Sequence, residues 1–330
     1  MPRSEGVSGN GMQALQLRVA RKSMEAGGVA AFELRSPDGA ELPAFTAGAH
    51  VDVFLRDGLV RQYSLCNAPH ERDRYVLGVQ RKADSRGGSI AMHDEVHEGS
   101  VVGIGLPRNL FPMVPARRSL LFGAGIGITP LLSMAEALHA RGEAFELHYS
   151  ARSPEQAAFR AQLAAAAYAD RVRFHFSAGP GANRLELPPL LATPDPEARL
   201  YVCGPTGYID DITAFASAHG WRGDQVCVER FAAAPVASVD GEQAFDVVLA
   251  RSGRRFTITP GQAIHEVLLD AGVDVPLSCE QGVCGTCLTP VLAGVPDHRD
   301  SFLDASEHAR NDCMTLCCSR AKSPELVLDL

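Results

Sequence analysis

The chain has 330 residues, 46% of them hydrophobic and 21% charged, which is more than one ordinary hydrophobic core can hold, so two or three domains are expected. It carries 31 basic and 39 acidic residues, a net charge of −8, and without a basic block it lacks the phosphate-binding surface of a nucleic-acid binder. No apolar run approaches the roughly twenty residues of a membrane-spanning helix, and the polar first dozen residues contain no secretory signal. We therefore expect a cytoplasmic protein that binds neither nucleic acid nor membranes.

Residues 12–115 are expected to form a small antiparallel β-barrel. Short runs that alternate polar and apolar residues, among them LQLRVARKSM, HVDVFLRDG and RYVLGVQRK, are separated by Gly, Pro and Asp. Their spacing is typical of antiparallel sheet.

Residues 116–231 change to an alternation of strands and helices. The apolar strand SLLF is followed by a glycine-rich turn and the long helical run TPLLSMAEALHARG, and the same order recurs through FELHYSA, RVRFHFSA and RLYVCGP. This alternation predicts an α/β domain, with a parallel sheet covered by helices.

Residues 244–330 are expected to form a third domain, after a linker at 232–243 that has no periodicity and few large side chains. Two candidate strands, AFDVVLARS and RRFTITP, precede a helix and then a cysteine-rich loop. From Glu242 to the C-terminus, 13 acidic and 7 basic residues give a net charge of −6, so most of the acidity of the chain lies here.

The cysteine-rich loop has the spacing of a metal centre. Cys279, Cys284 and Cys287 are spaced C-x4-C-x2-C, which is the plant-type [2Fe–2S] spacing. Gly282 and Gly285 would let backbone amides approach the cluster sulfides and donate hydrogen bonds that help to set its potential. Structural zinc is the alternative, but its ligands usually form two short C-x2-C pairs, and the loop has one.

The fourth ligand is open on spacing alone. Cys313, Cys317 and Cys318 all lie some thirty residues beyond the loop and all are candidates. Nine cysteines in a reducing compartment argue against a disulfide framework, so a cluster is the better explanation of this grouping.

The turn after SLLF is a candidate phosphate site. Gly123, Gly125 and Gly127 would let the backbone approach a diphosphate, and the amides at the start of the following helix favour negative charge. We expect Thr129 to be the N-cap and Pro130 the first helical residue. A purely steric turn is the alternative.

A second turn, Cys203-Gly204-Pro205, follows another strand of the same predicted sheet. Ligands of open parallel sheets bind beyond such carboxyl ends. The two turns together resemble the NAD(P)H module of the ferredoxin reductase superfamily, in which the cysteine-glycine turn lies beside the nicotinamide.

The barrel carries a candidate flavin signature. Arg61, Tyr63 and Ser64 lie on one predicted strand, which could also be an ordinary strand with a solvent-facing arginine. The turn from Arg86 to Ser89 precedes a helical run and offers amides, a hydroxyl and a guanidinium for a phosphate. In the superfamily, R-x-Y-S borders the isoalloxazine and the later Gly-Ser turn holds the flavin phosphate.

The order of flavin barrel, nicotinamide domain and C-terminal plant-type ferredoxin resembles the phthalate dioxygenase reductase and vanillate demethylase reductase family over residues 12–330. The resemblance implies a β-grasp ferredoxin domain, FMN, a [2Fe–2S] cluster and NADH, with NADPH as the other possible donor. It also selects Cys317 as the fourth ligand, because TLCCSRAKS is similar to the closing strand of the family.

The family resemblance assigns the cofactor-binding residues. Those for FMN are Arg61, Tyr63, Ser64, Arg86, Gly87, Gly88, Ser89, Thr129 and Phe231. Those for the nicotinamide cofactor are Gly123, Gly125, Gly127, Thr129, Pro130, Arg152, Cys203, Gly204 and Pro205.

No residue needs to act as a general acid or base in this interpretation. Ser64 and Cys203 position the flavin and the nicotinamide, Phe231 lies against the flavin, and Glu229 lies near the nicotinamide. NADH-preferring relatives often carry an acidic residue after the strand that ends in FHFSAGPG, where this chain has Ser177.

The resemblance implies that this chain is the reductase of a two-component Rieske non-heme iron oxygenase that hydroxylates or demethylates an aromatic acid. A reductase for a cytochrome P450 and a non-catalytic iron–sulfur redox sensor are the alternatives. We expect a monomer that meets the oxygenase through an acidic face near the cluster, with candidate residues Glu280, Asp297, Asp300 and Asp304.

The 11 histidines show no closely spaced pair with a carboxylate that would indicate a mononuclear metal site. His50, His93 and His175 are expected to be core or surface residues. The triplet His298-Arg299-Asp300 matches part of the kinase signature, but no other kinase motif accompanies it, so we expect it to be structural.

Overall fold

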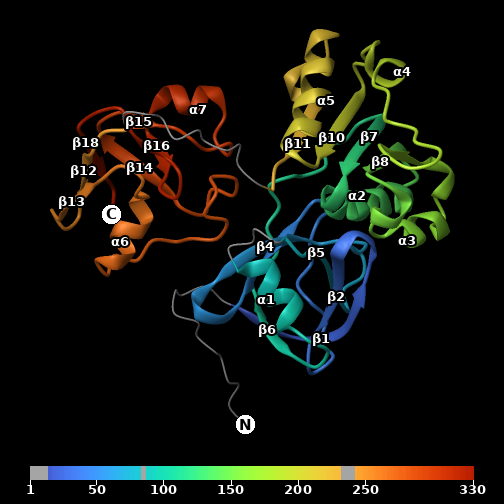
Figure 1. Ribbon diagram of the computed structural model, residues 1–330, viewed down its shortest axis with the longest axis horizontal. Coiled ribbons are helices and arrows are strands. Elements are labelled where there is room, and N and C mark those ends of the chain that lie inside the picture. Colours follow the sequence, from blue (N-terminus) through green and yellow to red (C-terminus); the bar gives the residue numbers. More distant parts are fainter. Residues whose placement is uncertain (1–13, 83–86, 232–241) are drawn as a thin grey trace. The chain divides into compact units, whose positions relative to one another are not determined.

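The computed structural model describes residues 14–82, 87–231 and 242–330. The chain divides into two compact units, Met1–Glu229 and Arg230–Leu330, and each is described by itself (Figure 1). In the described part of the chain, no helix has the length and apolar character needed to cross a membrane.

The first unit begins with a six-stranded antiparallel sheet in the order β4-β3-β6-β1-β2-β5. An antiparallel bridge between Leu65 and Leu77 links the end of β4 to β5, so the two edges of the sheet meet as in a barrel. Apolar side chains such as Phe32, Val51 and Ile104 fill the interior. The elements are β1 (Leu15–Met24), β2 (Val29–Arg35), β3 (His50–Phe54), β4 (Val60–Ser64), β5 (Tyr75–Gln80), α1 (Gly88–Asp94) and β6 (Val101–Ile104).

The same unit continues with a parallel sheet in the order β11-β10-β7-β8-β9. Leu120 and Phe122 of β7 pack with Ile209 of α5 on one face, whereas Gly123 contacts Leu131 of α2 on the other. The elements are β7 (Arg118–Ala124), α2 (Ile128–Ala140), β8 (Ala144–Ala151), α3 (Arg160–Ala165), β9 (Val172–Phe176), α4 (Pro188–Leu191), β10 (Ala198–Cys203), α5 (Thr206–Ala218) and β11 (Val226–Glu229).

The second unit is an α+β domain around a mixed sheet in the order β13-β12-β18-β14-β16. Only β12 and β18 run parallel; β12 forms a hairpin with β13, and Ile264 and Leu268 of α6 join the core beneath the sheet. The elements are β12 (Phe245–Leu249), β13 (Arg255–Ile258), α6 (Ile264–Asp270), β14 (Leu288–Ala293), β15 (Pro296–Asp297), α7 (Ala305–Arg310), β16 (Cys313–Thr315), β17 (Arg320–Ala321) and β18 (Glu325–Leu328).

These three architectures confirm the fold class predicted from the sequence: an antiparallel barrel, a parallel α/β sheet and a C-terminal α+β domain. The linker predicted at 232–243 lies almost wholly outside the described residues.

Candidate functional site

The cysteine loop lies between α6 and β14 and gathers the predicted thiols. The amide of Gln281 donates to Cys279 Sγ at 3.3 Å, and the amide of Gly282 donates to Cys317 Sγ at 3.2 Å. Contacts from the neighbouring thiols of Cys284 and Cys317 hold the pKa of Cys279 well below its usual range. Cys317 therefore lies with the loop cysteines although thirty residues separate it from Cys287.

The other two candidates for fourth ligand lie differently. Cys313 is in β16, opposite Pro290 of β14, and its pKa is raised by burial and by Asp312 rather than by another thiol. Cys318 Sγ contacts the hydroxyl of Thr315 at 3.2 Å and also lies beside Gly282 and the Cys317 thiol, but no loop amide donates to it among the described residues. The geometry favours Cys317, whose amide donor comes from the loop itself.

Two glycines shape the loop. Gly282 has φ +69° and Gly285 has φ +68°, a region that is costly for residues with a Cβ. A Cβ on Gly282 would also run into Cys318 Sγ, and one on Gly285 would run into the ring of Phe302. Four thiols with backbone amides aimed at their sulfurs are a donor set that fits an iron–sulfur cluster.

The predicted flavin-phosphate residues converge in the barrel. Arg61 of β4 lies against Gly88 at the start of α1, because a Cβ on Gly88 would be 2.8 Å from Arg61 Nε. Gly87 has φ +90°, and the hydroxyl of Ser89 accepts a bond from the amide of Lys82 at 3.2 Å. Arg86 lies outside the described residues. Arg61, Gly87 and Gly88 therefore lie together at the start of α1, and their role in binding the flavin phosphate stays a prediction.

Tyr63 and Ser64 occupy the end of β4, where Ser64 is buried and pairs with His50 of β3. Burial raises the pKa of the Tyr63 hydroxyl, so this phenol is neutral at physiological pH. The two residues present polar groups, not charges, at this end of the barrel.

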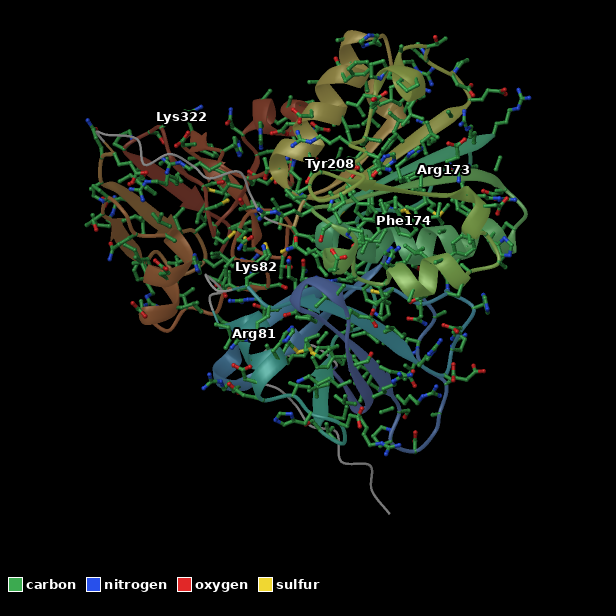
Figure 2. All side chains as sticks on the ribbon, turned by 45° about the vertical axis from the view of Figure 1, so that its right-hand side comes forward. Arg81, Lys82, Arg173, Phe174, Tyr208 and Lys322 are labelled. Atoms are coloured by element: carbon green, nitrogen blue, oxygen red, sulfur yellow. The ribbon has the colours of Figure 1, made fainter. Side chains whose placement is uncertain are left out.

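The two predicted nucleotide turns lie in contact. Cys203 pairs with Gly123 across β10 and β7, and a Cβ on Gly127 would lie 2.6 Å from the amide nitrogen of Gly204. The ring of Tyr208 lies against the corresponding position on Gly204 (Figure 2). Glycine at these positions thus permits a close approach of the two turns.

The start of α2 differs from the prediction. Its N-cap is Gly127 and its first residue is Ile128, so Thr129 is not the N-cap and Pro130 is not the first helical residue. The turn Gly125–Gly127 already winds as a 3-10 helix, so the helix starts closer to the N-terminus than predicted. The hydroxyl of Thr129 donates to Ile126 O at 2.9 Å, and its methyl group packs towards Gly78 of β5.

Cys203, which is buried, pairs with Glu229, which is half-buried with its Oε2 atom shielded from solvent, at the ends of β10 and β11. Burial raises the pKa of the Cys203 thiol far above its usual value and that of Glu229 to about 8. Glu229 Oε2 has no hydrogen-bond partner among the described residues. An unpartnered buried carboxyl is costly unless a ligand completes it, so this position is suited to a polar group of a bound molecule.

Arg152 and Pro205 also lie at the carboxyl ends of the parallel strands. Arg152 follows β8, is exposed, and accepts a backbone bond from Ala178 at 2.9 Å, while Pro205 is the N-cap of α5. Phe231 belongs to the second unit, so its place against the flavin stays a prediction.

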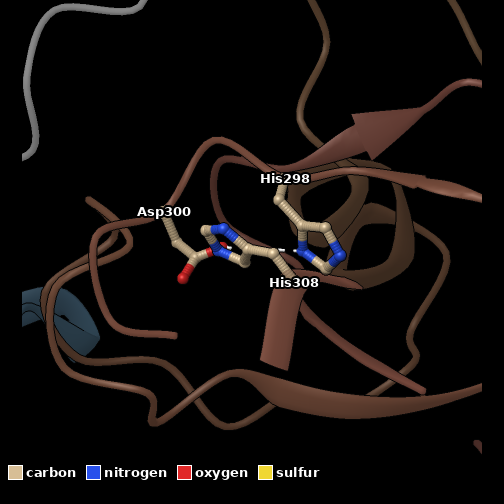
Figure 3. A group of neighbouring side chains, drawn as sticks. All are labelled: His298, Asp300 and His308. Atoms are coloured by element: carbon tan, nitrogen blue, oxygen red, sulfur yellow. Dashed lines mark hydrogen bonds and ion pairs between the residues drawn. The ribbon is translucent and has the colours of Figure 1, made fainter. Parts of the chain in front are cut away.

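The structure gathers one group of two histidines and a carboxylate that the sequence analysis did not expect. His298, Asp300 and His308 converge in the second unit (Figure 3), because a turn and the short helix α7 bring together residues eight to ten positions apart. The spacing of the histidines along the chain does not indicate this contact. Asp300 is fully buried, so it cannot belong to the acidic face predicted to meet the oxygenase. Asp297 pairs with Arg299 at 2.8 Å, which partly neutralises it.

The full-length matches to known proteins cover more than nine-tenths of the chain. Residues 247–322 match the 2Fe-2S iron-sulfur cluster binding domain. The vanillate O-demethylase oxidoreductase of Pseudomonas putida is 49% identical over 316 residues, which cover 94% of this chain and 98% of that protein.

Two solved structures are similar to this chain over nearly its full length. Phthalate dioxygenase reductase, described as a modular structure for electron transfer from pyridine nucleotides to [2Fe-2S], is 40% identical, with a TM-score of 0.76 over 96% of this chain and 98% of that one. An intact type IV self-sufficient cytochrome P450 monooxygenase is 36% identical, with a TM-score of 0.82 over 96% of this chain and 41% of that one. The chain therefore belongs to the family of phthalate dioxygenase and vanillate demethylase reductases, which are modular flavin and iron–sulfur oxidoreductases.

Proposed function

We propose that this protein is the reductase component of a two-component Rieske non-heme iron oxygenase, carrying electrons from NADH through FMN and a [2Fe–2S] cluster to the oxygenase. The observation that carries the proposal is the gathering of the Cys317 thiol with those of the cysteine loop, in a chain that also holds a flavin-type barrel and a nucleotide-type sheet. The substrate class is an aromatic acid that is hydroxylated or O-demethylated by the partner.

The bound cofactors supply the redox chemistry, because flavin accepts a hydride and releases single electrons, which nicotinamide cannot do. The residues of the chain supply position and environment. Cys279, Cys284, Cys287 and Cys317 would hold the cluster, and the amides of Gln281 and Gly282 already point at two of these sulfurs.

Arg61 and the turn at residues 86–89 would hold the FMN phosphate, since a guanidinium forms strong charge-assisted bonds to phosphate oxygens. Tyr63 and Ser64 would lie beside the isoalloxazine as neutral hydrogen-bonding groups. Thr129 is a weaker candidate than the sequence suggested, because its hydroxyl is already bonded to Ile126 O.

The nicotinamide would lie beside Cys203 and Glu229, two groups that are protonated at neutral pH. The buried thiol cannot act as a nucleophile, and the neutral carboxyl can donate one hydrogen bond to a ligand without placing a negative charge there. Gly125, whose Cβ position faces open space, would leave room for the diphosphate, while Gly127 and Gly204 let the two turns pack closely. Exposed Arg152 is placed where a 2′-phosphate could be met, so use of NADPH belongs to the proposal.

The partner, the oligomeric state and the module bounds are parts of the same proposal. The chain would act as a cytoplasmic monomer with modules at 12–115, 116–231 and 244–330. Exposed acidic side chains of the segment from Glu242 onwards, which has a net charge of −6, would contact the oxygenase.

A cytochrome P450 is the second candidate acceptor, favoured by the similarity to the self-sufficient monooxygenase. The higher identity and the near full-length match to the vanillate demethylase reductase favour the Rieske oxygenase.

The test is the visible spectrum of the purified protein under anaerobic NADH. Flavin and cluster absorbance should both bleach, and a Rieske oxygenase added afterwards should become reduced while a P450 stays oxidised. Bleaching of the flavin alone would contradict the proposed electron path, and reduction of the P450 alone would select the second candidate.

A further inference from the structure

A buried group of two histidines and one aspartate lies in the second unit, outside the cysteine loop. His298 and Asp300 follow β15, and His308 lies on α7. Asp300 Oδ1 is 3.3 Å from His308 Nε2 and 3.8 Å from His298 Nδ1, and one ligand atom from each of the three residues lies within 4.8 Å of the others (Figure 3). None of the three has a place in the electron path proposed above.

Asp300 is held so that one oxygen faces the histidines. Its other oxygen, Oδ2, accepts hydrogen bonds from the amides of Phe302 at 3.1 Å and Leu303 at 2.8 Å. The side chain is fully buried, which removes solvent as a partner. Oδ1 is therefore a preorganised acceptor at the centre of the group, oriented by backbone bonds as the outer-shell contacts of a metal ligand usually are.

His298 lacks the partners that a buried imidazole normally has. Its side chain is 7% exposed, and neither ring nitrogen makes a hydrogen bond of acceptable geometry to the described residues, although the side chain of Asn311 lies beside the ring. Its ring stacks on that of His308, with centroids 4.4 Å apart. Burial, followed by the nearby charge of His308, lowers the pKa of His298. A buried nitrogen without a partner is costly and indicates a missing ligand.

We propose that His298, Asp300 and His308 bind one divalent transition-metal ion of the zinc class, separate from the iron–sulfur cluster. Two imidazole nitrogens and one carboxylate oxygen suit Zn²⁺, Co²⁺ or Ni²⁺, whereas Mg²⁺ and Ca²⁺ prefer oxygen ligands. Such sites hold a solvent molecule as the fourth ligand, and the 30% exposure of His308 provides the entry path.

The observed separations are close to those of a closed site. Zinc bonds of about 2.0–2.2 Å in a tetrahedron place ligand atoms roughly 3.4 Å apart. The two distances to Asp300 Oδ1, 3.3 and 3.8 Å, are close to this spacing. The distance between the ligand nitrogens of His298 and His308 lies within 4.8 Å and would shorten if the partly exposed ring of His308 turned.

The ion would also restrict the motion of the segment around Ser301 and Phe302, which packs against the cysteine loop. The amide of Ser301 donates to Gly282 O at 3.0 Å, and the ring of Phe302 fills the space over Gly285. Because the three ligands join α7 to this supporting segment, bound metal should slow the loss of the cluster. This consequence gives a readout that does not depend on turnover.

The test uses the full chain with flavin and cluster bound, and with an iron content of two per chain so that no cluster thiol is vacant. The protein is equilibrated with buffered Zn²⁺, and the zinc content is measured by mass spectrometry. Wild type should retain about one zinc per chain, whereas His308→Gln and Asp300→Asn should retain at least fivefold less. His97→Gln, an exposed histidine of the barrel, is the matched control and should bind as wild type does.

His308→Gln is the decisive variant, because it leaves the amide contacts of Asp300 intact. A wild-type protein that retains no zinc, or a His308→Gln variant that retains as much as wild type, would overturn the proposal. In a second measurement, Zn²⁺ should lengthen the half-life of cluster absorbance in urea for wild type and not for His308→Gln, and Ca²⁺ should have no effect. Equal protection of both proteins would also overturn it.

Discussion

The cysteine loop takes three of its four proposed ligands from residues 279–287, whereas the turns around Cys203 are built from the ends of three strands spread over residues 118–229. In the loop, left-handed glycines and amides aimed at sulfur do the positioning. At the strand ends, sheet register does it, since Cys203 pairs with Gly123 on one side and Glu229 on the other. A single substitution should therefore abolish binding at the cysteine loop, whereas at the strand ends around Cys203 it should only weaken binding.

The largest effect is expected at the fourth thiol. Cys317→Ser should lose cluster absorbance, because three ligands and a poorer serine oxygen cannot hold the cluster, while reduction of the flavin by NADH should survive. Cys313→Ser and Cys318→Ser are the controls and should keep the cluster. Iron analysis beside the visible spectrum checks this, and a full cluster in Cys317→Ser would show that another cysteine serves.

The next effect concerns Glu229 and stability. Its pKa is raised by burial from 4.5 to about 8, so the neutral carboxyl stabilises the fold below pH 4.5 and this contribution is lost as pH rises through about 8. A shift of this size corresponds to on the order of 5 kcal/mol across the window. Glu229→Gln should remove that part of the pH dependence.

The single tryptophan, Trp221, packs in the core of the parallel-sheet domain and reports its unfolding. Urea unfolding followed by its fluorescence from pH 5 to 8.5 gives the difference between wild type and Glu229→Gln. The exposed Glu197→Gln is the control and should keep the wild-type slope. Parallel curves for wild type and Glu229→Gln would mean that Glu229 is ionised in the folded protein.

A smaller effect is expected at the flavin phosphate. Arg61→Ala should weaken FMN binding about ten- to a hundredfold, because a charge-assisted bond to phosphate contributes about 1.5–3 kcal/mol. Arg18→Ala, an exposed arginine of β1, should leave the affinity unchanged. Titration of the apoflavin protein with FMN measures both, and chromatography of the released cofactor would reveal FAD if the flavin assignment is wrong.

The contrast between the two regions also explains what could be predicted from the sequence. The fold class and the cysteine loop were accessible because alternation of strands and cysteine spacing are local patterns. The start of α2 at Ile128 could not be predicted from the sequence. It follows a 3-10 turn that depends on the close contact between Gly127 and the turn at Gly204.

The group around Asp300 was missed for a related reason. His298 and His308 are ten residues apart, a spacing typical of neither a helix face nor a strand, and they meet only because the chain turns back through α7. The burial of Asp300 is likewise a tertiary effect, and it removes one acidic residue from the predicted docking face.

The smallest effect is expected on docking, and it separates the acidic second unit from the first. If Glu280 on the cysteine loop meets a basic patch of the oxygenase, electron transfer to the partner should slow as the Debye length shrinks from about 10 Å at 0.1 M salt to about 3 Å at 1 M. Hydride transfer from NADH to FMN within one chain should change little. Glu280→Gln should flatten the salt dependence more than Asp246→Asn, which removes a charge from β12, near the opposite edge of the sheet. Stopped-flow measurement of both steps checks this, and a partner-reduction rate indifferent to salt would leave the electron path intact while removing electrostatic attraction as the means by which the two proteins meet.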